Sequence, residues 1–270
     1  MSMPACLFNG EAADRIPVTD RGLGYGDGLF RTVLLKQGRP TLWHWHWQCL
    51  QHDCTALGLP LPAESVLLAE LARLAAALPL AVGKIVLTRG SGARGYALPQ
   101  PVVPTRLVSV AGFAPQPYPD GVTVRWCRLE LASQPRLAGV KHLNRLENVL
   151  ARAEWDDPAI REGLLCDAEG WLTEACACNV FVDFGSHVAT PLLDRCGVAG
   201  AARACLLDCL ADRLGRPVRV ERIARAAVQG AQGLWLCNSV VGVLPVRQLD
   251  ALAFGLPDSA RVAADILAAA

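Results

Sequence analysis

A lysine at position 141 follows four small or apolar residues in the stretch LAGVKHLNRLENVLARAEW, residues 137–155. Most surface lysines have polar neighbours, whereas an apolar pocket disfavours the ammonium form, lowers the pKa and leaves a usable amine. Such a lysine can form a Schiff base with a carbonyl compound. A lysine that merely flanks a helix has the same local sequence, so Lys141 is a catalytic candidate only if other residues support it.

A carboxylate follows an apolar segment in the stretch GWLTEACACNVF, where Glu174 stands among small side chains. An enzyme that uses pyridoxal phosphate needs an acid facing the pyridine nitrogen, and Glu174 could keep that nitrogen protonated. The alternative for Glu174 is a glutamate at a strand end in a salt bridge.

A phosphate could be held in the stretch CGVAGAARACLLD, which begins a predicted helix with Gly197 and Gly200. Small residues let backbone N–H groups at a helix start approach an anion, and the helix dipole favours it. Asn238 and Ser239 in LCNSVVG are further donors. A tight turn into a packed helix would have a similar sequence.

A substrate carboxylate could be bound by the stretch TRGSGARGY, which puts Arg89, Arg94 and Tyr96 in a predicted flexible loop. Arginine binds a carboxylate through two parallel hydrogen bonds. Solvated loop arginines are common, so this signal too is only suggestive.

The elements that must position these residues are strands and helices mixed in both halves of the chain. Gly22, Gly24, Gly26 and Gly28 predict a loop that leads into a strand. The strand is expected at residues 29–35, and helices at 44–57, 63–78 and about 142–155. The stretch PQPYPDG at residues 115–121 holds three prolines and a glycine, which indicates a linker. The sequence therefore predicts an α/β (α+β) fold with an N-terminal domain at residues 1–114 and a C-terminal domain at residues 122–270.

Composition excludes several classes of protein. The chain has 270 residues, of which 52% are hydrophobic and 19% charged, so it is not disordered. The net charge is +1 and no basic run occurs, which argues against nucleic acid or an anionic membrane as the main partner. The apolar region at residues 66–82 is broken by Glu70 and Arg73 and predicts a core-facing helix rather than a membrane span.

The cysteines and histidines give no strong metal signal. The 11 cysteines form no C-x-x-C pair, and the N-terminal stretch MSMPACLFNG has no basic segment followed by an apolar run. We therefore expect no signal peptide, and cysteines buried in a reducing cytoplasm. His44 and His46 in WHWHW could bind a metal, but a third ligand is lacking, and no metal site is predicted.

Taken in order, the motifs DRGLGYGDGLF, TRGSGARGY, GVKHLNRLE, GWLTEACACNVF, GVAGAAR and NSVVGVLPV form one pattern. The chain resembles the fold-type IV pyridoxal phosphate enzymes, from about residue 7 to residue 247. This group includes branched-chain aminotransferases, D-amino acid aminotransferases and aminodeoxychorismate lyases. The stretches LAGVKHLNRLENVLAR and RGSGARGY are most similar to the lyases.

The resemblance implies roles for individual residues. Lys141 would carry pyridoxal 5'-phosphate in a site between two domains, and Glu174 would face the pyridine nitrogen. The resemblance further implies that Asn179 lies behind the cofactor ring, that the backbone amides of Val198 and Ala199 and the hydroxyl of Ser239 bind the phosphate, and that Arg94, Tyr96 and Phe30 bind substrate. It also implies a homodimer that splits 4-amino-4-deoxychorismate into 4-aminobenzoate and pyruvate for folate synthesis, and the cysteines place it in the cytoplasm.

One position departs from the pattern of the group. An arginine is expected in an H-x-x-R-L segment, where it grips the cofactor phosphate, but this chain reads HWQCL with Cys49 at that place. A thiol cannot replace a guanidinium at a phosphate. Either another cation, such as His46 or His52, takes its place, or the cofactor is held by backbone amides and hydroxyls.

An aminotransferase would use the same lysine and the same cofactor ring. It would protonate a carbon of the cofactor, whereas a lyase would use Lys141 to remove a proton at substrate C4 and then protonate the departing enolpyruvate. The residues alone do not separate the lyase from a D-amino acid or branched-chain aminotransferase.

Overall fold

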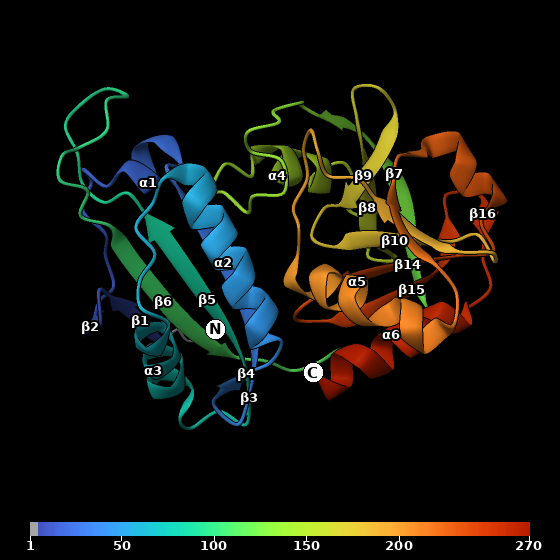
Figure 1. Ribbon diagram of the computed structural model, residues 1–270, viewed down its shortest axis with the longest axis horizontal. Coiled ribbons are helices and arrows are strands. Elements are labelled where there is room, and N and C mark those ends of the chain that lie inside the picture. The colour runs from blue at the N-terminus through green and yellow to red at the C-terminus, as the bar shows by residue number, and fades with distance from the viewer. Residues whose placement is uncertain (1–4) are drawn as a thin grey trace. The chain divides into compact units, whose positions relative to one another are not determined.

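The chain forms two compact units in the computed structural model, which describes residues 5–270 (Figure 1). The first unit runs to Pro115 and also takes in Val140–Asn144, and the second consists of Gln116–Gly139 and Arg145–Ala270. Residues 1–4, which belong to the stretch considered for a signal peptide, lie outside the described residues. Lys141 therefore belongs to the first unit, although it follows the predicted linker in sequence.

One antiparallel sheet forms the centre of the first unit, with strand order β2-β1-β6-β5-β3-β4. Its strands are β1 (Ala5–Phe8), β2 (Glu11–Ala12), β3 (Gly28–Lys36), β4 (Arg39–Pro40), β5 (Leu80–Thr88) and β6 (Thr105–Gly112). The helices of this unit are α1 (Arg21–Tyr25), α2 (Trp43–Leu57) and α3 (Glu64–Ala75). Side chains alternate between the two faces of a strand, so one row of β3 enters the core that the sheet shares with α2 and α3. That buried row consists of Leu29, Arg31, Val33 and Leu35.

The second unit contains a mixed sheet with strand order β12-β11-β10-β14-β15-β7-β8-β9-β13, and β16 pairs with β15. Its strands are β7 (Val122–Leu131), β8 (Ile160–Asp167), β9 (Trp171–Ala175), β10 (Asn179–Asp183), β11 (Val188–Pro191), β12 (Val218–Glu221), β13 (Ile223–Ala224), β14 (Gly233–Asn238), β15 (Gly242–Leu249) and β16 (Leu252–Ala253). Its helices are α4 (Leu146–Arg152), α5 (Ala201–Leu214), the 3-10 helix η1 (Arg225–Gly230) and α6 (Asp258–Ala269). Figure 1 shows α5 and α6 side by side, and they pack on β14 and β15 respectively. The mixture of helices and sheets confirms the predicted fold class.

The helix after Lys141 begins later than predicted. The sequence suggested a start near His142, but α4 begins at Leu146. His142 instead forms an antiparallel bridge with Leu29 of β3, and the N–H of Leu143 donates to the carbonyl of Gly28 at 2.9 Å. Pairing with a neighbouring strand has overridden the local helical pattern.

The glycine-rich stretch before β3 is a short helix and not the predicted loop. Asp20 caps the N-terminus of α1, because its carboxylate accepts the N–H of Gly22 at 2.8 Å. Gly26 ends the helix with φ of 63°, a left-handed conformation that glycine adopts without strain.

The described residues show no feature of a membrane span or a metal centre. Among residues 5–270, no helix combines the length and the apolar character needed to cross a bilayer. The same residues contain no cluster of three or more His, Cys, Asp or Glu side chains arranged to hold a metal ion. All 11 cysteines are free.

Candidate active site

The backbone of Lys141 is fixed from two sides within the first unit. Its carbonyl accepts the N–H of Phe30 at 2.9 Å, and its own N–H donates to the carboxylate of Asp53 at 3.2 Å. The Nζ atom of Lys141 lies over the ring of Phe30, 4.7 Å from the centroid. Val140, the preceding residue, is fully buried. The structure therefore brings together two predicted site residues, Lys141 and Phe30, in a partly apolar setting.

Two charged residues that sequence reasoning missed lie beside this lysine. Asp53 is 0% exposed and Arg31 is 2% exposed, and their side chains form an ion pair. The guanidinium of Arg31 also reaches the carbonyl of Cys49, with a distance of 3.5 Å from Nη2 to the oxygen. A signal was present in the sequence, because Arg31 occupies an inward position in the otherwise apolar row of β3. A buried charge requires a partner, and α2 supplies it.

Neither proposed substitute for the missing arginine at position 49 is a buried cation. Burial, together with the charges of Arg31 and Lys141, lowers the pKa of His46 to about 3, so its imidazole is neutral. Neither ring nitrogen of His46 has a hydrogen-bond partner among residues 5–270. The side chain of His52 is 61% exposed, and its Nδ1 lies 3.2 Å from Asp53.

Cys49 itself is partly buried, and burial raises the pKa of its thiol. The charge of Asp53 adds to this rise, whereas Arg31 and Lys141 lower the pKa without cancelling it. A neutral thiol therefore stands where the resemblance expects a guanidinium. The buried cation that lies against residue 49 is Arg31, which comes from β3 and not from α2.

In the second unit, Glu174 organises the chain that leads into α5. Glu174 lies on β9 and is 3% exposed. Its Oε2 accepts the N–H of Val198 at 2.7 Å, and its Oε1 accepts the side-chain amide of Asn148 at 3.2 Å. These two bonds hold the carboxylate against the chain that precedes α5 and against Asn148.

Asn179 holds the same chain from the neighbouring strand β10. Its Nδ2 donates to the carbonyl of Val198 at 2.7 Å, and its Oδ1 accepts the N–H of Gly200 at 3.1 Å. A Cβ atom on Gly200 would lie 2.4 Å from that same Oδ1. We call residues 197–202 the α5 entrance. Its shape depends on Asn179 and on the absence of a side chain at position 200.

The amides of Val198 and Ala199, which were predicted to bind the phosphate, already have acceptors in the protein. The N–H of Val198 donates to Glu174, and the N–H of Ala199 donates to the carbonyl of Gly139 at 2.9 Å. Both amides therefore have protein acceptors, since this part of the chain pairs with Gly139 in a parallel bridge. The helix starts at Ala201, and the N–H groups of Ala201 and Ala202 have no acceptor within the described part of the chain. First-turn amides of a helix lack acceptors within the helix, so these two are the open donors.

Ser239 lies in the turn between β14 and β15 and is partly buried. Asn238, the other predicted donor, shapes this turn, because its Oδ1 accepts the N–H groups of Val240 and Val241 at 2.9 Å each. The side-chain oxygen of Asn238 thus stabilises the turn. Ser239 remains a predicted hydroxyl donor to a phosphate.

Arg94 and Tyr96 lie on an exposed loop of the first unit. Tyr96 is 86% exposed, and its ring lies 5.5 Å from that of Tyr25. Among residues 5–270, no hydrogen bond or ring contact joins either residue to Lys141. The structure therefore leaves both of these predicted substrate residues exposed.

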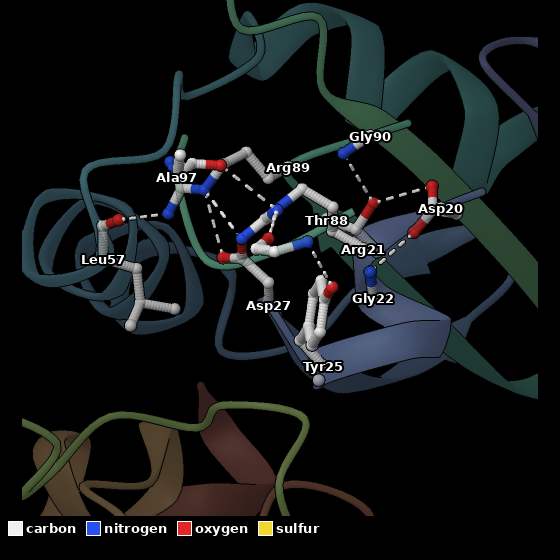
Figure 2. A network of polar contacts seen from close by, with 12 residues as sticks. Asp20, Arg21, Gly22, Tyr25, Asp27, Leu57, Thr88, Arg89, Gly90 and Ala97 are labelled. Atoms are coloured by element: carbon white, nitrogen blue, oxygen red, sulfur yellow. Dashed lines mark hydrogen bonds and ion pairs between the residues drawn. The ribbon is translucent and has the colours of Figure 1, made fainter. Parts of the chain in front are cut away.

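Arg89, which the sequence grouped with them, has a structural role. Figure 2 shows its guanidinium against Asp27, with Nε at 2.9 and 3.1 Å from the two carboxylate oxygens. Its other nitrogens donate to the carbonyls of Leu57 at 2.7 Å and Gly58 at 2.9 Å. Arg89 is 4% exposed. Arg89 connects the end of β5 to the end of α2. Its guanidinium nitrogens already donate to Asp27, Leu57 and Gly58, so they are not available for a substrate carboxylate.

Asp27 also binds Arg21, which holds the exposed loop. The Nε of Arg21 lies 2.8 Å from Asp27, and its Nη1 donates to the carbonyls of Gly95 at 2.9 Å and Ala97 at 3.3 Å. Burial raises the pKa of Asp27, but hydrogen bonds from Arg89 and Arg21 outweigh that effect and hold it below its usual range. The loop with Tyr96 is therefore anchored at its base by a fixed carboxylate.

Comparison with known proteins identifies the family. A family model described as "Amino-transferase class IV" matches residues 28–249. The chain is 34% identical over 249 residues to an aminodeoxychorismate lyase of Vibrio harveyi, with 90% of both chains covered.

Solved structures show the same likeness. A 4-amino-4-deoxychorismate lyase of Pseudomonas aeruginosa has a TM-score of 0.89 and 40% identity, with 97% of each chain covered. A fold IV transaminase of Curtobacterium pusillum has a TM-score of 0.78 and 26% identity, with 95% of this chain and 91% of that one covered. These comparisons confirm the resemblance drawn from the ordered motifs and the fold-type IV architecture. The chain belongs to the class IV aminotransferase family.

Proposed function

We propose that this chain is a pyridoxal phosphate-dependent lyase that converts 4-amino-4-deoxychorismate into 4-aminobenzoate and pyruvate, a step of folate synthesis. The observation that carries the proposal is the likeness, over nearly the whole chain, to two proteins named as this lyase, at 34% and 40% identity. D-Alanine aminotransferases of Listeria monocytogenes are 25% identical over 263 residues. The lyase is therefore favoured over the aminotransferase.

The residues present fit pyridoxal phosphate. The open N–H groups of Ala201 and Ala202 at the start of α5, together with the helix dipole, suit a phosphate. A Cβ atom at position 200 would have no room beside Asn179, so only glycine fits there. Glu174 supplies a buried carboxylate for the pyridine nitrogen. We therefore move the proposed amide contacts from Val198 and Ala199 to the first turn of α5, and we retain Ser239 as a hydroxyl donor.

When bound, pyridoxal phosphate supplies an electron sink for the electron pair left behind as a proton leaves the substrate. Glu174 would hold a proton on the pyridine nitrogen, and its bonds to Val198 and Asn148 orient its carboxylate. Asn179 would act indirectly, because it fixes the backbone that Glu174 also binds.

Lys141 would be the lysine that attaches the cofactor and then moves the proton. As a neutral amine it would remove the proton at substrate C4, and as an ammonium it would protonate the departing enolpyruvyl group. The aromatic ring formed in 4-aminobenzoate favours this cleavage. The face of Phe30, 4.7 Å from Nζ, would limit the approach of water to the amine and would line the substrate pocket.

We also propose that the protein acts as a homodimer, in which Arg94 and Tyr96 bind the substrate carboxylate. The loop that carries them belongs to a surface of the first unit with several exposed apolar side chains. They are Val18 (87%), Leu23 (63%), Tyr96 (86%), Leu98 (53%) and Val103 (69%). Exposed apolar residues gathered in one unit favour burial by a partner. A monomer in sedimentation at micromolar concentration that keeps full activity would contradict this proposal.

A cytoplasmic location is proposed as well. It is supported by 11 free cysteines, a composition that suits a reducing compartment.

An assay of two products tests the lyase against the aminotransferase. Purified protein with pyridoxal phosphate is mixed with 4-amino-4-deoxychorismate, and pyruvate and 4-aminobenzoate are measured. A parallel assay measures amine transfer from D-alanine or a branched-chain amino acid to a keto acid. We expect equal amounts of the two products and little transfer. Rapid transfer without release of 4-aminobenzoate would establish the aminotransferase instead.

A further inference from the structure

We propose that Asp53 is a positioning residue for Lys141, with its carboxylate held in place by Arg31. The inference rests on the proposed role of Lys141 as the lysine that carries the cofactor. It adds two residues, from α2 and β3, that neither the motifs nor the comparisons assign to the reaction.

The contacts that carry the inference lie within the first unit. Asp53 is 0% exposed, and its Oδ2 accepts the N–H of Lys141 at 3.2 Å. The same Oδ2 pairs with Nη2 of Arg31, which is 2% exposed. Because the arginine also contacts the carbonyl of Cys49, the carboxylate is fixed to both β3 and α2. The backbone of Lys141 is thus bound to a carboxylate that a buried ion pair with Arg31 holds in place.

The second fixed point is the carbonyl of Lys141, which accepts the N–H of Phe30 at 2.9 Å. Residues 140–144, which we call the Lys141 segment, have no regular secondary structure of their own beyond a single bridge to Leu29. Two backbone hydrogen bonds flank that bridge, from the N–H of Phe30 to Lys141 and from the N–H of Leu143 to Gly28. Loss of the Asp53 contact therefore releases one of the few restraints on the start of the lysine side chain, and a small misplacement of a reacting group is costly.

Asp53 and Lys141 both act on the thiol of Cys49, so we infer that the charge of Asp53 also reaches the lysine nitrogen. Three elements around the Lys141 segment carry charged or titratable groups: Arg31 and Lys36 on β3, His44, His46, Cys49, His52, Asp53 and Cys54 on α2, and Lys84 on β5. Arg31 and Lys84 are cations that disfavour a protonated nitrogen at Lys141, and His46 is neutral. Asp53 is the anion of this group and favours the protonated form. We expect removal of this charge to make the protonated form less favourable.

The experiment compares Asp53→Asn with Glu70→Gln in the complete protein loaded with pyridoxal phosphate. Glu70 is a matched control, because it is 7% exposed and binds Arg106 of the same unit at 2.7 and 2.8 Å. Both substitutions remove one negative charge from a buried arginine pair, but Glu70 makes no contact with Lys141. The readouts are kcat, KM and the pH midpoint of the visible absorbance of the bound cofactor.

We expect Asp53→Asn to lower the absorbance midpoint by about one pH unit, since one neighbouring charge typically shifts a pKa by that amount or more. We expect kcat to fall about tenfold with KM changed less than about twofold, the pattern of an interaction that matters after substrate is bound. Glu70→Gln should leave the midpoint and kcat close to those of the unchanged protein. Equal effects of the two substitutions, or no effect of Asp53→Asn, would overturn the inference.

Asp53→Asn takes the carboxylate partner away from the buried guanidinium of Arg31 and could prevent folding. The double variant Arg31→Met with Asp53→Leu removes both charges and avoids this problem. It should fold, keep the absorbance midpoint and still lose about tenfold in kcat, because the acceptor for the Lys141 N–H is gone. A double variant with unchanged kcat would overturn the positioning role.

Borohydride reduction followed by peptide mass analysis separates this inference from the proposed function. If the unchanged protein does not carry the cofactor on Lys141, both fail. If it does, and the Asp53 variants behave like the Glu70 control, the inference alone fails.

Discussion

The Lys141 segment and the α5 entrance are held by different kinds of contact. The first is held through a buried ion pair, in which Arg31 secures the carboxylate that binds the backbone of Lys141. The second is held by bonds to backbone groups, in which Glu174 and Asn179 bind Val198 and Gly200.

This difference separates the consequences of substitution in the two places. An ion pair in the interior is sensitive to charge, because removing one partner leaves the other unpaired. The α5 entrance is sensitive to the volume of the side chains placed in it, because a Cβ atom added at Gly200 must displace Asn179. We therefore expect charge changes to disturb the Lys141 segment and small steric changes to disturb the α5 entrance.

The largest effect is expected at the amine itself. Lys141→Ala should abolish attachment of the cofactor and lower turnover by about 10³-fold or more, because both the nucleophile and the proton carrier are lost. Lys84→Ala is the matched control, since its Nζ lies over the same Phe30 ring, 5.0 Å from the centroid. Visible absorbance measures attachment of the cofactor in the two variants, and product release measures their turnover. Turnover that survives in Lys141→Ala would remove the assignment of the lysine.

The second effect concerns the charge at the α5 entrance. Glu174→Gln keeps the size of the side chain but removes the charge that would keep the pyridine nitrogen protonated. We expect the cofactor still to bind and turnover to fall about 100-fold, because a charge-assisted hydrogen bond contributes about 1.5–3 kcal/mol and each 1.4 kcal/mol is a factor of ten.

Glu169→Gln is the control for that substitution, because Glu169 precedes the same strand and its side chain is 57% exposed in a pair with Arg195. Its turnover should stay near that of the unchanged protein. If Glu174→Gln also keeps its turnover, Glu174 serves only to hold Val198 in place.

The third effect tests volume at the α5 entrance. Gly200→Ala would put a Cβ atom 2.4 Å from Oδ1 of Asn179, so the first turn of α5 must shift. We expect the Kd for pyridoxal phosphate to rise about tenfold, which corresponds to about 1.4 kcal/mol. Binding of pyridoxal, which lacks the phosphate, should change much less.

Gly255→Ala is the matched control for Gly200→Ala, because an added Cβ there has no neighbour within 4 Å. Equal Kd values for Gly200→Ala and Gly255→Ala would show that the α5 entrance does not hold the phosphate.

Strong local patterns predicted the scaffold of the site. Helices expected at 44–57 and 63–78 are found as α2 (Trp43–Leu57) and α3 (Glu64–Ala75), and the strand expected at 29–35 is β3 (Gly28–Lys36). Each of these elements buries a regularly spaced row of residues that is largely apolar, interrupted by Arg31 in β3, by His46 and Asp53 in α2 and by Glu70 in α3, so much of their periodicity is present in the sequence itself.

The contacts that fix the site could not be predicted, because they join residues far apart in the chain. Asp53 binds the backbone of a residue 88 positions later, and Glu174 binds one 24 positions later. No local pattern reveals that the N–H of Val198 already has a protein acceptor, so the sequence could not show which amides are open to a phosphate. The charge of Arg31 in an apolar row was the one visible sign that a partner had to exist.

The smallest effect concerns Cys49 and refines the account of the Lys141 segment. Cys49→Arg restores the residue that the family pattern expects, but Arg31 already contacts the carbonyl of this position. Two guanidinium groups would then share the carboxylate of Asp53, so we expect the free energy of unfolding to fall by about 1–3 kcal/mol, as for other partly buried unpaired charges. Urea unfolding measures this change, and Cys49→Ser, which keeps a small neutral side chain, should stay close to the unchanged protein. A Cys49→Arg variant that is equally stable and binds pyridoxal phosphate more tightly would mean that Arg31 leaves an anion site open. In that case the ion pair with Asp53 would have to be broken, or shared, when the cofactor binds.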